Sequence, residues 1–480
     1  MARISGQLLL VMGGMMVLSL AVSLYLHDGA AVALAKALGV IVAAGLLLCV
    51  VLGRKSTFEM YGRDSFWLTS IVWMLVPAAG ALPYFFYGLG EGPTDTLFES
   101  VSGFTTTGSS ITTLPELLPK GLLLWRSTTQ WIGGLGLILF VVALNRRLAS
   151  GSIQLYDAEF SGTQQRKLHP HIAVSVSRMW HIYTLLTIIL IVALKFCGNG
   201  TFDSVTIALS TVSTGGFVTH SAGFANANSA TFAVLTVFMF LSGVNVALLY
   251  NFFTLRWRHL KHSEEFVAYS VIFVVAVAVS VTSFLAENNL LKESVRYSLF
   301  HVASTLSTCG FYIDRPPHWS FPVSVLTFLL MFVGAMAGST GGGLKIRRLM
   351  TLVRYLRNYM TRMIHPNVVF SIKIDRKTVP AEYVNKIFAF VFLYICFVTG
   401  GGFILTLCGS SIPEALSMAA ANMANLGPSP LMDAAGSMPV YASLPIVSKC
   451  TLMVLMLAGR LEIFALLALV SPAYSLFKRQ

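Results

Sequence analysis

A short run of small residues that ends in a glycine occurs four times in the sequence. Glycine adopts backbone dihedral angles that turn successive carbonyl oxygens toward one side, and its missing side chain keeps a passage open. Rings of backbone carbonyl oxygens replace the water around a cation in known ion filters. Hydroxyl side chains in the first three runs add potential oxygen ligands. The sequence therefore predicts a cation filter made of Thr106, Thr107, Gly108, Ser213, Thr214, Gly215, Thr308, Cys309, Gly310, Asn425, Leu426 and Gly427.

An ordinary turn explains such a glycine when it occurs once. Here each glycine follows a short amphipathic segment and precedes a long apolar run, and the four copies share this phase. The repetition favours a filter over isolated turns. The fourth copy departs most from the pattern, because Asn425 and Leu426 replace the Ser/Thr residues of the other copies. We therefore expect the fourth loop to contribute less to ion coordination.

Long apolar runs provide the elements that must position these loops. Of the 480 residues, 55% are hydrophobic and 11% are charged, and the mean hydropathy is +0.74. This composition excludes a soluble globular protein. A helix needs roughly 20 apolar residues to cross a bilayer, so the sequence predicts an all-α integral membrane protein with about ten spans. The predicted spans are 6–26, 30–52, 66–88, 121–146, 172–197, 231–256, 266–287, 321–345, 385–408 and 446–471.

The four glycine runs divide most of the chain into repeated units of spanning helix, re-entrant pore loop and spanning helix. Irregular backbone at membrane depth is tolerated only where protein buries it or where it lines a water-filled cavity. Four such loops can surround one axis, which indicates a pore. Two extra helices precede the repeats. The predicted divisions are 1–55 for these two helices and 56–150, 151–260, 261–365 and 366–480 for the four units.

The basic residues predict the orientation of the chain. The net charge of +13 is concentrated in connectors on one side of the predicted spans, which excludes a nucleic-acid-binding surface and favours a cytoplasmic location for these connectors. An even number of spans places both termini on that same side. Such a face also attracts anionic lipid. The basic residues concerned are Arg54, Lys55, Arg63, Arg146, Arg147, Arg166, Lys167, Arg256, Arg258, Lys261, Arg347, Arg348, Arg354, Arg357 and Arg362.

Four acidic residues, Asp95, Glu99, Asp203 and Glu414, lie at or near the predicted outer ends of the short pore helices. The opposite ends point toward the bilayer centre, where the partial negative charge of a helix C-terminus favours a cation. The acids either concentrate cations at the mouth or cap the helix N-termini. The capping explanation is the more general one, and the sequence favours it.

Two further features predict a restriction just inside the filter. A glycine-rich run interrupts the eighth span, and glycine disfavours helix, so we expect a break there rather than a close helix contact. Arg460 lies deep in the last span, where a charge costs roughly 2.5–3.5 kcal/mol, so it must face protein or water. It either restricts ion flow or ties helices together. The predicted gate consists of Gly338, Ser339, Thr340, Gly341, Gly342, Gly343 and Arg460.

Lys449 precedes Arg460 by about three helical turns on the same face of the last span. We predict that this face, and therefore Lys449, points into the pore. Glu462 lies two residues beyond Arg460 and points elsewhere on the helix, so it is not the expected partner of that arginine.

Together with the four loops, the segments 126–136 (RSTTQWIGGLG), 338–345 (GSTGGGLK) and 459–462 (GRLE) resemble the Trk/Ktr/HKT superfamily of potassium transporters. The resemblance covers essentially the whole chain and is closest to the bacterial TrkH/TrkG branch, which the two extra helices also fit. It implies four membrane–pore–membrane units with the glycines above in the filter. It also implies that the glycine-rich run is an intramembrane loop that gates the pathway together with Arg460.

The resemblance further implies potassium uptake across the bacterial inner membrane. Relatives with serine at the first filter position tend to carry sodium, and this chain has Gly108 there. It implies a homodimer and a separate cytoplasmic regulatory subunit of the TrkA type, which would bind the nucleotide. No cofactor beyond the transported potassium ion is expected on this chain.

Two kinds of alternative stay open on the sequence alone. A sodium-permeable or proton-coupled transporter has the same fold. A membrane-embedded enzyme requires convergent acids, bases or metal ligands at membrane depth; we find no such group in the sequence and predict neither an enzyme nor another metal site. The six scattered cysteines predict reduced thiols.

Overall fold

The computed structural model describes residues 2–52, 62–136, 172–225, 227–254, 262–286, 290–313, 321–365, 367, 371–429 and 441–470. Within these ranges the chain is almost entirely helical, apart from one two-stranded hairpin. Six helices are long and apolar enough to cross a membrane, and a bent pair raises the number to seven. The prediction of an all-α membrane protein is therefore confirmed.

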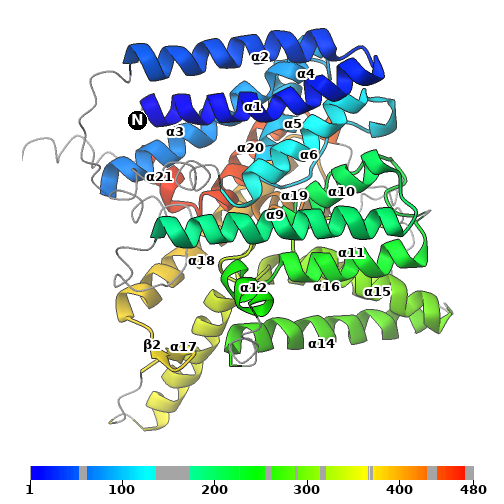
Figure 1. The fold of residues 1–480 in the computed structure, drawn as a ribbon. Helices are drawn as coiled ribbons and strands as arrows, with labels where there is room; N and C mark the ends of the chain where they lie inside the picture. Colours follow the sequence, from blue (N-terminus) through cyan, green and yellow to red (C-terminus); the bar gives the residue numbers. More distant parts are fainter. Residues whose placement is uncertain are drawn as a thin grey trace, which may run out of the picture.

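Each predicted span contains a helix or a pair of consecutive helices, but residues 137–146 of the fourth span lie outside the described residues and the helix of the eighth span ends at Val333. Figure 1 shows the long ones lying roughly parallel. Their bounds are α1 (Ala2–Leu26), α2 (Ala31–Leu46) with the π-helical turn η1 (Leu47–Leu52), α3 (Gly62–Gly80) with α4 (Leu82–Tyr87), α6 (Lys120–Gly134), α9 (Ile172–Phe196), α11 (Ser229–Ser242) with α12 (Val246–Phe253), α14 (Glu264–Ala286), α16 (Phe321–Val333), α18 (Ala381–Leu407) and α20 (Ile446–Arg460) with α21 (Phe464–Val470).

Two spans are broken where the sequence predicted continuous helices. Helices α11 and α12 meet at an angle of 115°. Asn245 starts α12 there by accepting the amide hydrogen of Ala247, an N-cap that requires non-helical backbone. The last span breaks between α20 and α21, where Glu462 and Ile463 have φ angles of 56° and 59°. Neither break carries a proline that would have revealed it in the sequence.

Four short helices lie between the spans of the four units: α5 (Pro93–Phe104), α10 (Thr201–Val212), α15 (Leu291–Leu306) and α19 (Ile412–Met423). Each packs against a helix of the preceding unit as well as against its own. Helix α6 contacts α10, α11 contacts α15, α16 contacts α19, and α20 returns to contact α5. This cyclic packing closes the four units around one centre.

Helices α1 and α2 stand outside this ring. They pack on each other and on the first unit through a cluster of buried side chains that includes Met16, Leu34 and Trp125. Figure 1 shows them along one edge of the molecule. The two extra helices predicted before the first repeat are therefore present.

The long hydrophilic connector between the third and fourth units contains helix α17 (Ile346–Ile364) and the antiparallel hairpin β1 (Lys373–Ile374) and β2 (Lys377–Thr378). Helix α17 leaves the body of the molecule obliquely to the long helices (Figure 1). Two further short turns, η2 (Pro115–Leu117) and η5 (Tyr441–Ser443), belong to the connectors that follow α5 and α19. Several basic residues used to predict the orientation lie outside the described residues, namely Arg54, Lys55, Arg146, Arg147, Arg166, Lys167, Arg256, Arg258 and Lys261.

Candidate ion pathway

The four pore helices end in the same backbone motif. At each end an amide N–H donates to the carbonyl five residues earlier, which closes a helix C-terminus with a residue in the left-handed conformation. Because the four ends are alike, the repeats of the sequence are also repeats of conformation. The hydrogen bonds run from Thr107 to Ser102 (2.9 Å), Gly215 to Ser210 (2.8 Å), Cys309 to Ser304 (2.8 Å) and Leu426 to Ala421 (2.9 Å).

The left-handed residue in each motif is not a glycine. Thr106, Thr214, Thr308 and Asn425 have φ angles of 54°, 55°, 59° and 54°. This conformation is unusual for any residue with a side chain and is a clear outlier for β-branched threonine. Each such residue costs on the order of 1–3 kcal/mol, and such strain concentrates at functional sites. Here it turns the chain from the pore helix into the loop.

A glycine lies two residues after each of these left-handed residues, and the four glycines form a closed ring. A Cβ atom added at Gly108 would lie 2.3 Å from the carbonyl oxygen of Gly215. The same atom at Gly216 would lie 2.2 Å from the Cys309 oxygen, at Gly310 2.0 Å from the Leu426 oxygen, and at Gly427 2.3 Å from the Thr107 oxygen. Each loop thus touches the carbonyl of the next, and the fourth touches the first.

The ring differs by one residue from the predicted alignment of the second loop. Gly216, with a φ angle of 79°, occupies the place of Gly108, Gly310 and Gly427 in the other loops. Gly215 occupies the place of the residue before the glycine. The sequence contains both glycines in succession, so the pattern alone did not fix the register. The left-handed conformation of Thr214 fixes it.

Helix α6 supports the second loop through a residue that sequence reasoning missed. The Gln130 amide Nε2 donates to the Gly215 carbonyl at 2.6 Å, and its Oε1 accepts the Phe217 N–H at 3.3 Å. Gln130 is fully buried. A polar side chain within an apolar span is a signal of function in a membrane, and that signal was available in the sequence.

The first pore helix and α6 are joined by a buried ion pair. Arg126 Nε lies 2.7 Å from Glu99 Oε1, and the two side chains are 3% and 0% exposed. The guanidinium also lies 4.2 Å from the ring centre of Phe217 and donates to the Ser110 hydroxyl. Glu99 in turn accepts the Ile111 N–H at 2.9 Å. The pair therefore holds the first and second loops against the same helix.

The other acids at the outer ends of the pore helices also have protein partners. Asp203 accepts a hydrogen bond from the Thr219 hydroxyl at 3.1 Å. Glu414 forms a capping box with Ser411 at the start of α19. These contacts favour the structural explanation for the acids over a cation-concentrating mouth.

Lys449 does not point into the pore as predicted. Its ammonium lies 2.6 Å from Asp95 Oδ1, in the first turn of α5, and donates to the Ala442 carbonyl. Both side chains of the pair are buried, at 5% and 8% exposed. Helix α20 packs on α5 along this face. The face that was predicted to line the pore therefore forms the contact between units one and four.

Loop hydroxyls and amides mostly hold the loops rather than stand free as ligands. Ser213 donates to carbonyls of its own helix, and the Thr107 hydroxyl pairs with Thr105 at 2.8 Å. In the fourth loop, Asn425 Nδ2 donates to the Thr107 hydroxyl and to the Met456 carbonyl of α20, both at 3.0 Å. Asn425 therefore links the fourth loop to the first loop and to the last span.

The glycine-rich segment between α16 and α17 leaves helical geometry and lies against the ends of three pore helices. The Thr340 hydroxyl is 3.2 Å from the Val212 carbonyl of α10, and the Gly342 N–H donates to the Thr308 hydroxyl at 2.8 Å. A Cβ atom at Gly342 would lie 2.1 Å from the Ala424 carbonyl, next to α19. The segment therefore sits directly below the loops.

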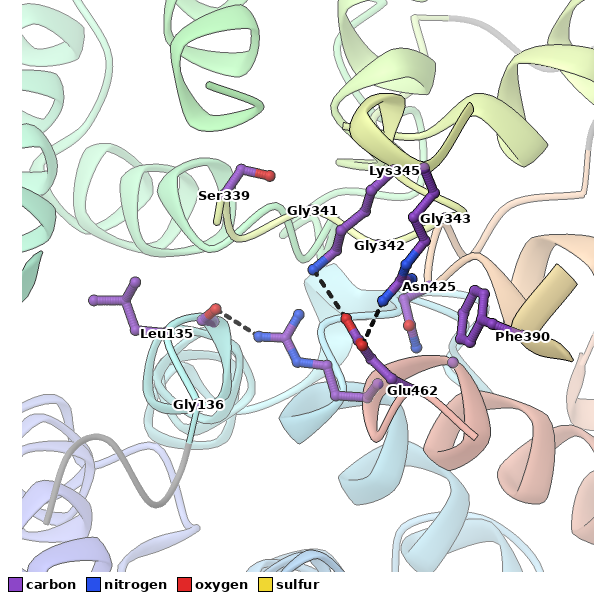
Figure 2. A pocket seen from close by; sticks show the side chains of 14 residues that line it. Leu135, Gly136, Ser339, Gly341, Gly342, Gly343, Lys345, Phe390, Asn425 and Glu462 are labelled. Atoms are coloured by element: carbon purple, nitrogen blue, oxygen red, sulfur yellow. Dashed lines mark hydrogen bonds and ion pairs between the residues drawn. The ribbon is translucent and has the colours of Figure 1, made fainter. Parts of the chain in front are cut away.

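Arg460 contacts this glycine-rich segment. Its guanidinium donates to the Thr340 carbonyl at 2.9 Å and to the carbonyls of Gly133 and Gly134 at the end of α6. A cavity of about 30 Å³ is bordered by Arg460, Gly134 and Ser339 (Figure 2). The positive charge of Arg460 and a small cavity therefore lie on the side of the loops that the glycine-rich segment covers.

Comparisons with known proteins were made on the sequence and on the fold. The sequence matches the TrkH family model, described as a cation transport protein, over residues 38–479. It is 33% identical to the Trk system potassium uptake protein TrkH of Halomonas elongata, with 98% of each chain covered. It is 30% identical to TrkG of Escherichia coli strain K12, with 87% and 86% covered.

The fold is similar to the crystal structure of the potassium transporter TrkH from Vibrio parahaemolyticus. The TM-score is 0.89, the sequence identity is 29%, and 98% of each chain is covered. The likeness therefore extends over the two N-terminal helices and all four units.

Proposed function

The chain belongs to the TrkH family of cation transport proteins, and we propose that it is the ion-conducting subunit of a potassium-uptake system. The observation that carries the proposal is the closed ring of four glycines, in which each pore loop touches a backbone carbonyl of the next. Relatives 33% identical to this chain are named potassium uptake proteins, which points to potassium as the cation.

Ion selection follows from the way the loops are held. Each loop places a backbone carbonyl oxygen against the glycine of a neighbouring loop, and carbonyl oxygens of such loops can replace the hydration shell of potassium. The C-termini of four pore helices end at the same place, where their partial negative charges favour a cation. Gln130 and the Arg126–Glu99 pair fix the loops from behind, which keeps the passage at one width.

Ion flow is restricted just below the loops. The glycine-rich segment lies against the pore helix ends, and Arg460 holds it through the Thr340 carbonyl. A guanidinium at this position repels a cation that leaves the filter. Conduction therefore requires the segment and Arg460 to move apart.

The setting proposed for this activity is the bacterial inner membrane, with both termini and helix α17 in the cytoplasm. The basic residues of α17 support this orientation by the positive-inside rule. We further propose a homodimer that works with a separate cytoplasmic nucleotide-binding subunit, as the family resemblance implies. The transported ion is then the only small ligand of this chain, and its activity is transport and not enzymatic catalysis.

Growth of a potassium-uptake-deficient strain on limiting potassium tests the function directly. The wild-type chain should restore growth, and Gly108→Ser should not, because the added side chain meets the Gly215 carbonyl at a left-handed position. Gly400→Ser is the matched control, since no atom lies within 4 Å of a Cβ added there. Equal growth with Gly108→Ser would refute the filter assignment.

Flux into liposomes separates the proposal from its alternatives. Potassium uptake that persists in an excess of external sodium supports potassium selectivity. Sodium uptake at a rate similar to that of potassium indicates the sodium-permeable alternative. An internal pH change that accompanies potassium entry and persists with the membrane potential clamped indicates proton coupling.

A further inference from the structure

The acidic residue next to the gate occupies an unusual position in the chain. Glu462 lies in the break between α20 and α21, two residues after Arg460, and both Glu462 and Ile463 have left-handed backbone conformations with φ angles of 56° and 59°. Non-glycine residues adopt this conformation only where the surroundings hold them in it. The Glu462 side chain points toward Lys345, just before the start of α17 (Figure 2).

Glu462 pairs with the two cationic residues that follow the glycine-rich segment. Its Oε2 lies 2.5 Å from Arg348 Nη2, and its Oε1 lies 3.5 Å from Lys345 Nζ. The Arg348 and Glu462 side chains are 8% and 17% exposed. The Arg348 guanidinium also stacks 4.0 Å from the ring centre of Phe390. This mostly buried pair therefore resists screening by salt far better than a surface pair.

We propose that Glu462 is a positioning residue that latches the downstream end of the glycine-rich segment in its closed place. Arg460 holds the middle of the segment through Thr340, and Glu462 holds its end through Lys345 and Arg348. Arg460 at the end of α20 and Glu462 in the break that follows thus hold the segment at two places, with side chains of opposite charge. The inference rests on the proposed gate and adds how that gate is kept shut.

The opposite end of the segment is anchored separately. The buried carboxylate of Glu265 accepts the Ala337 N–H at 2.6 Å, and Asn245 donates to the Ala337 carbonyl. These upstream contacts come from α14 and from the start of α12, and Glu265 also lies 3.9 Å from Arg347 of α17. A displacement of α17 therefore disturbs the close Glu462–Arg348 pair together with the longer Glu265–Arg347 contact.

Helix α17 has the form of a lever for this displacement. It extends 19 residues from the latch, and its far end carries exposed side chains such as Met363 and Ile364. A force applied near that end reaches the gate through the Lys345–Arg348 turn and through the contacts of α17 with α14. The left-handed backbone at Glu462 and Ile463 favours release once the pair is broken.

Unstimulated rubidium uptake by the purified chain in liposomes measures the latch. We expect Glu462→Gln and Arg348→Gln each to raise it about tenfold, which corresponds to about 1.4 kcal/mol, with an unchanged potassium-to-sodium ratio. The exchanged pair Glu462→Arg with Arg348→Glu should return uptake to within about threefold of wild type. Glu264→Gln is the matched control, because it breaks a more exposed pair with Arg354 of the same helix.

A cysteine introduced as Ser339→Cys reports the position of the segment without relying on flux. Ser339 borders the gate cavity, so a thiol reagent added from the cytoplasmic side should modify the cysteine about tenfold faster when Glu462→Gln is also present. The chain without Ser339→Cys provides the background from the native cysteines.

Three outcomes overturn the latch and can be told apart. If Glu462→Gln leaves both uptake and cysteine reactivity unchanged while Arg460→Ala raises uptake, the latch is wrong and the gate stands. If Arg460→Ala is also without effect, the proposed gate fails and the latch fails with it. Lower uptake with unchanged reactivity would make Glu462 a structural residue and would also refute the latch.

Discussion

The buried ion pair between Arg126 and Glu99 gives the sharpest prediction about how the loops are held. Its atoms are 2.7 Å apart, and its side chains are 3% and 0% exposed. Removing one partner of such a pair leaves a buried charge without compensation and costs about 3–5 kcal/mol. We expect this loss for Arg126→Met and for Glu99→Gln, because either change strands the other group between the first two loops.

The double variant distinguishes an ion pair from two independent contacts. With both charges removed, no stranded charge remains, so the double variant should lose less than the sum of the single losses, by about 1–3 kcal/mol. Equilibrium unfolding of the purified protein in mixed micelles measures all three variants. Liposome flux should show a lower potassium-to-sodium ratio in the singles.

A matched control uses Glu293, an exposed carboxylate in the first turn of another pore helix, α15. Glu293→Gln should change stability by less than about 0.5 kcal/mol. Losses for the Arg126 and Glu99 singles below about 1 kcal/mol, or losses that add within about 0.5 kcal/mol in the double variant, would refute the reasoning.

Two further predictions concern the ring and its supports, and a third concerns a contact between Glu116 and Ser221 in the connectors that follow the first and second loops. Gly216→Ala should abolish selective uptake, because its Cβ would lie 2.2 Å from a backbone carbonyl of the third loop; wild-type selectivity in flux would argue against the ring. Asn425→Leu should weaken selectivity, because it removes the amide bonds to Thr107 and to α20, and an unchanged sodium permeability would contradict this. Partial burial raises the pKa of the Glu116 carboxyl, but hydrogen bonds from Ser221 lower it more, so the net pKa is below its usual value. Glu116→Gln should therefore reduce thermal stability at neutral pH, and the difference should vanish as the pH falls through that lowered pKa; a difference independent of pH would refute it.

Much of the architecture was predictable because the membrane imposes it. The length of the apolar runs identified the spans. The four glycines identified the loops, because irregular backbone at membrane depth is tolerated only where protein buries it or where it lines a water-filled cavity. The break before α17 followed from the glycine-rich composition alone. These features depend on local chemistry, which the sequence states directly.

The remaining features depend on contacts between distant parts of the chain. Gly215 and Gly216 are adjacent, and only the conformation of Thr214 shows which one joins the ring. Lys449 lies on the face that helical spacing predicted, but that face packs on Asp95 of the first unit, which spacing cannot reveal. Gln130 and Arg126 carried a signal as polar residues in a span, although their partners did not follow from it.

The most direct test of the central claim is a structure determined with rubidium, whose anomalous scattering locates the ion. The account predicts a peak on the axis enclosed by Gly108, Gly216, Gly310 and Gly427, within coordination distance of backbone carbonyl oxygens of the four loops. A chain that binds rubidium elsewhere, with no peak inside this ring, would contradict it.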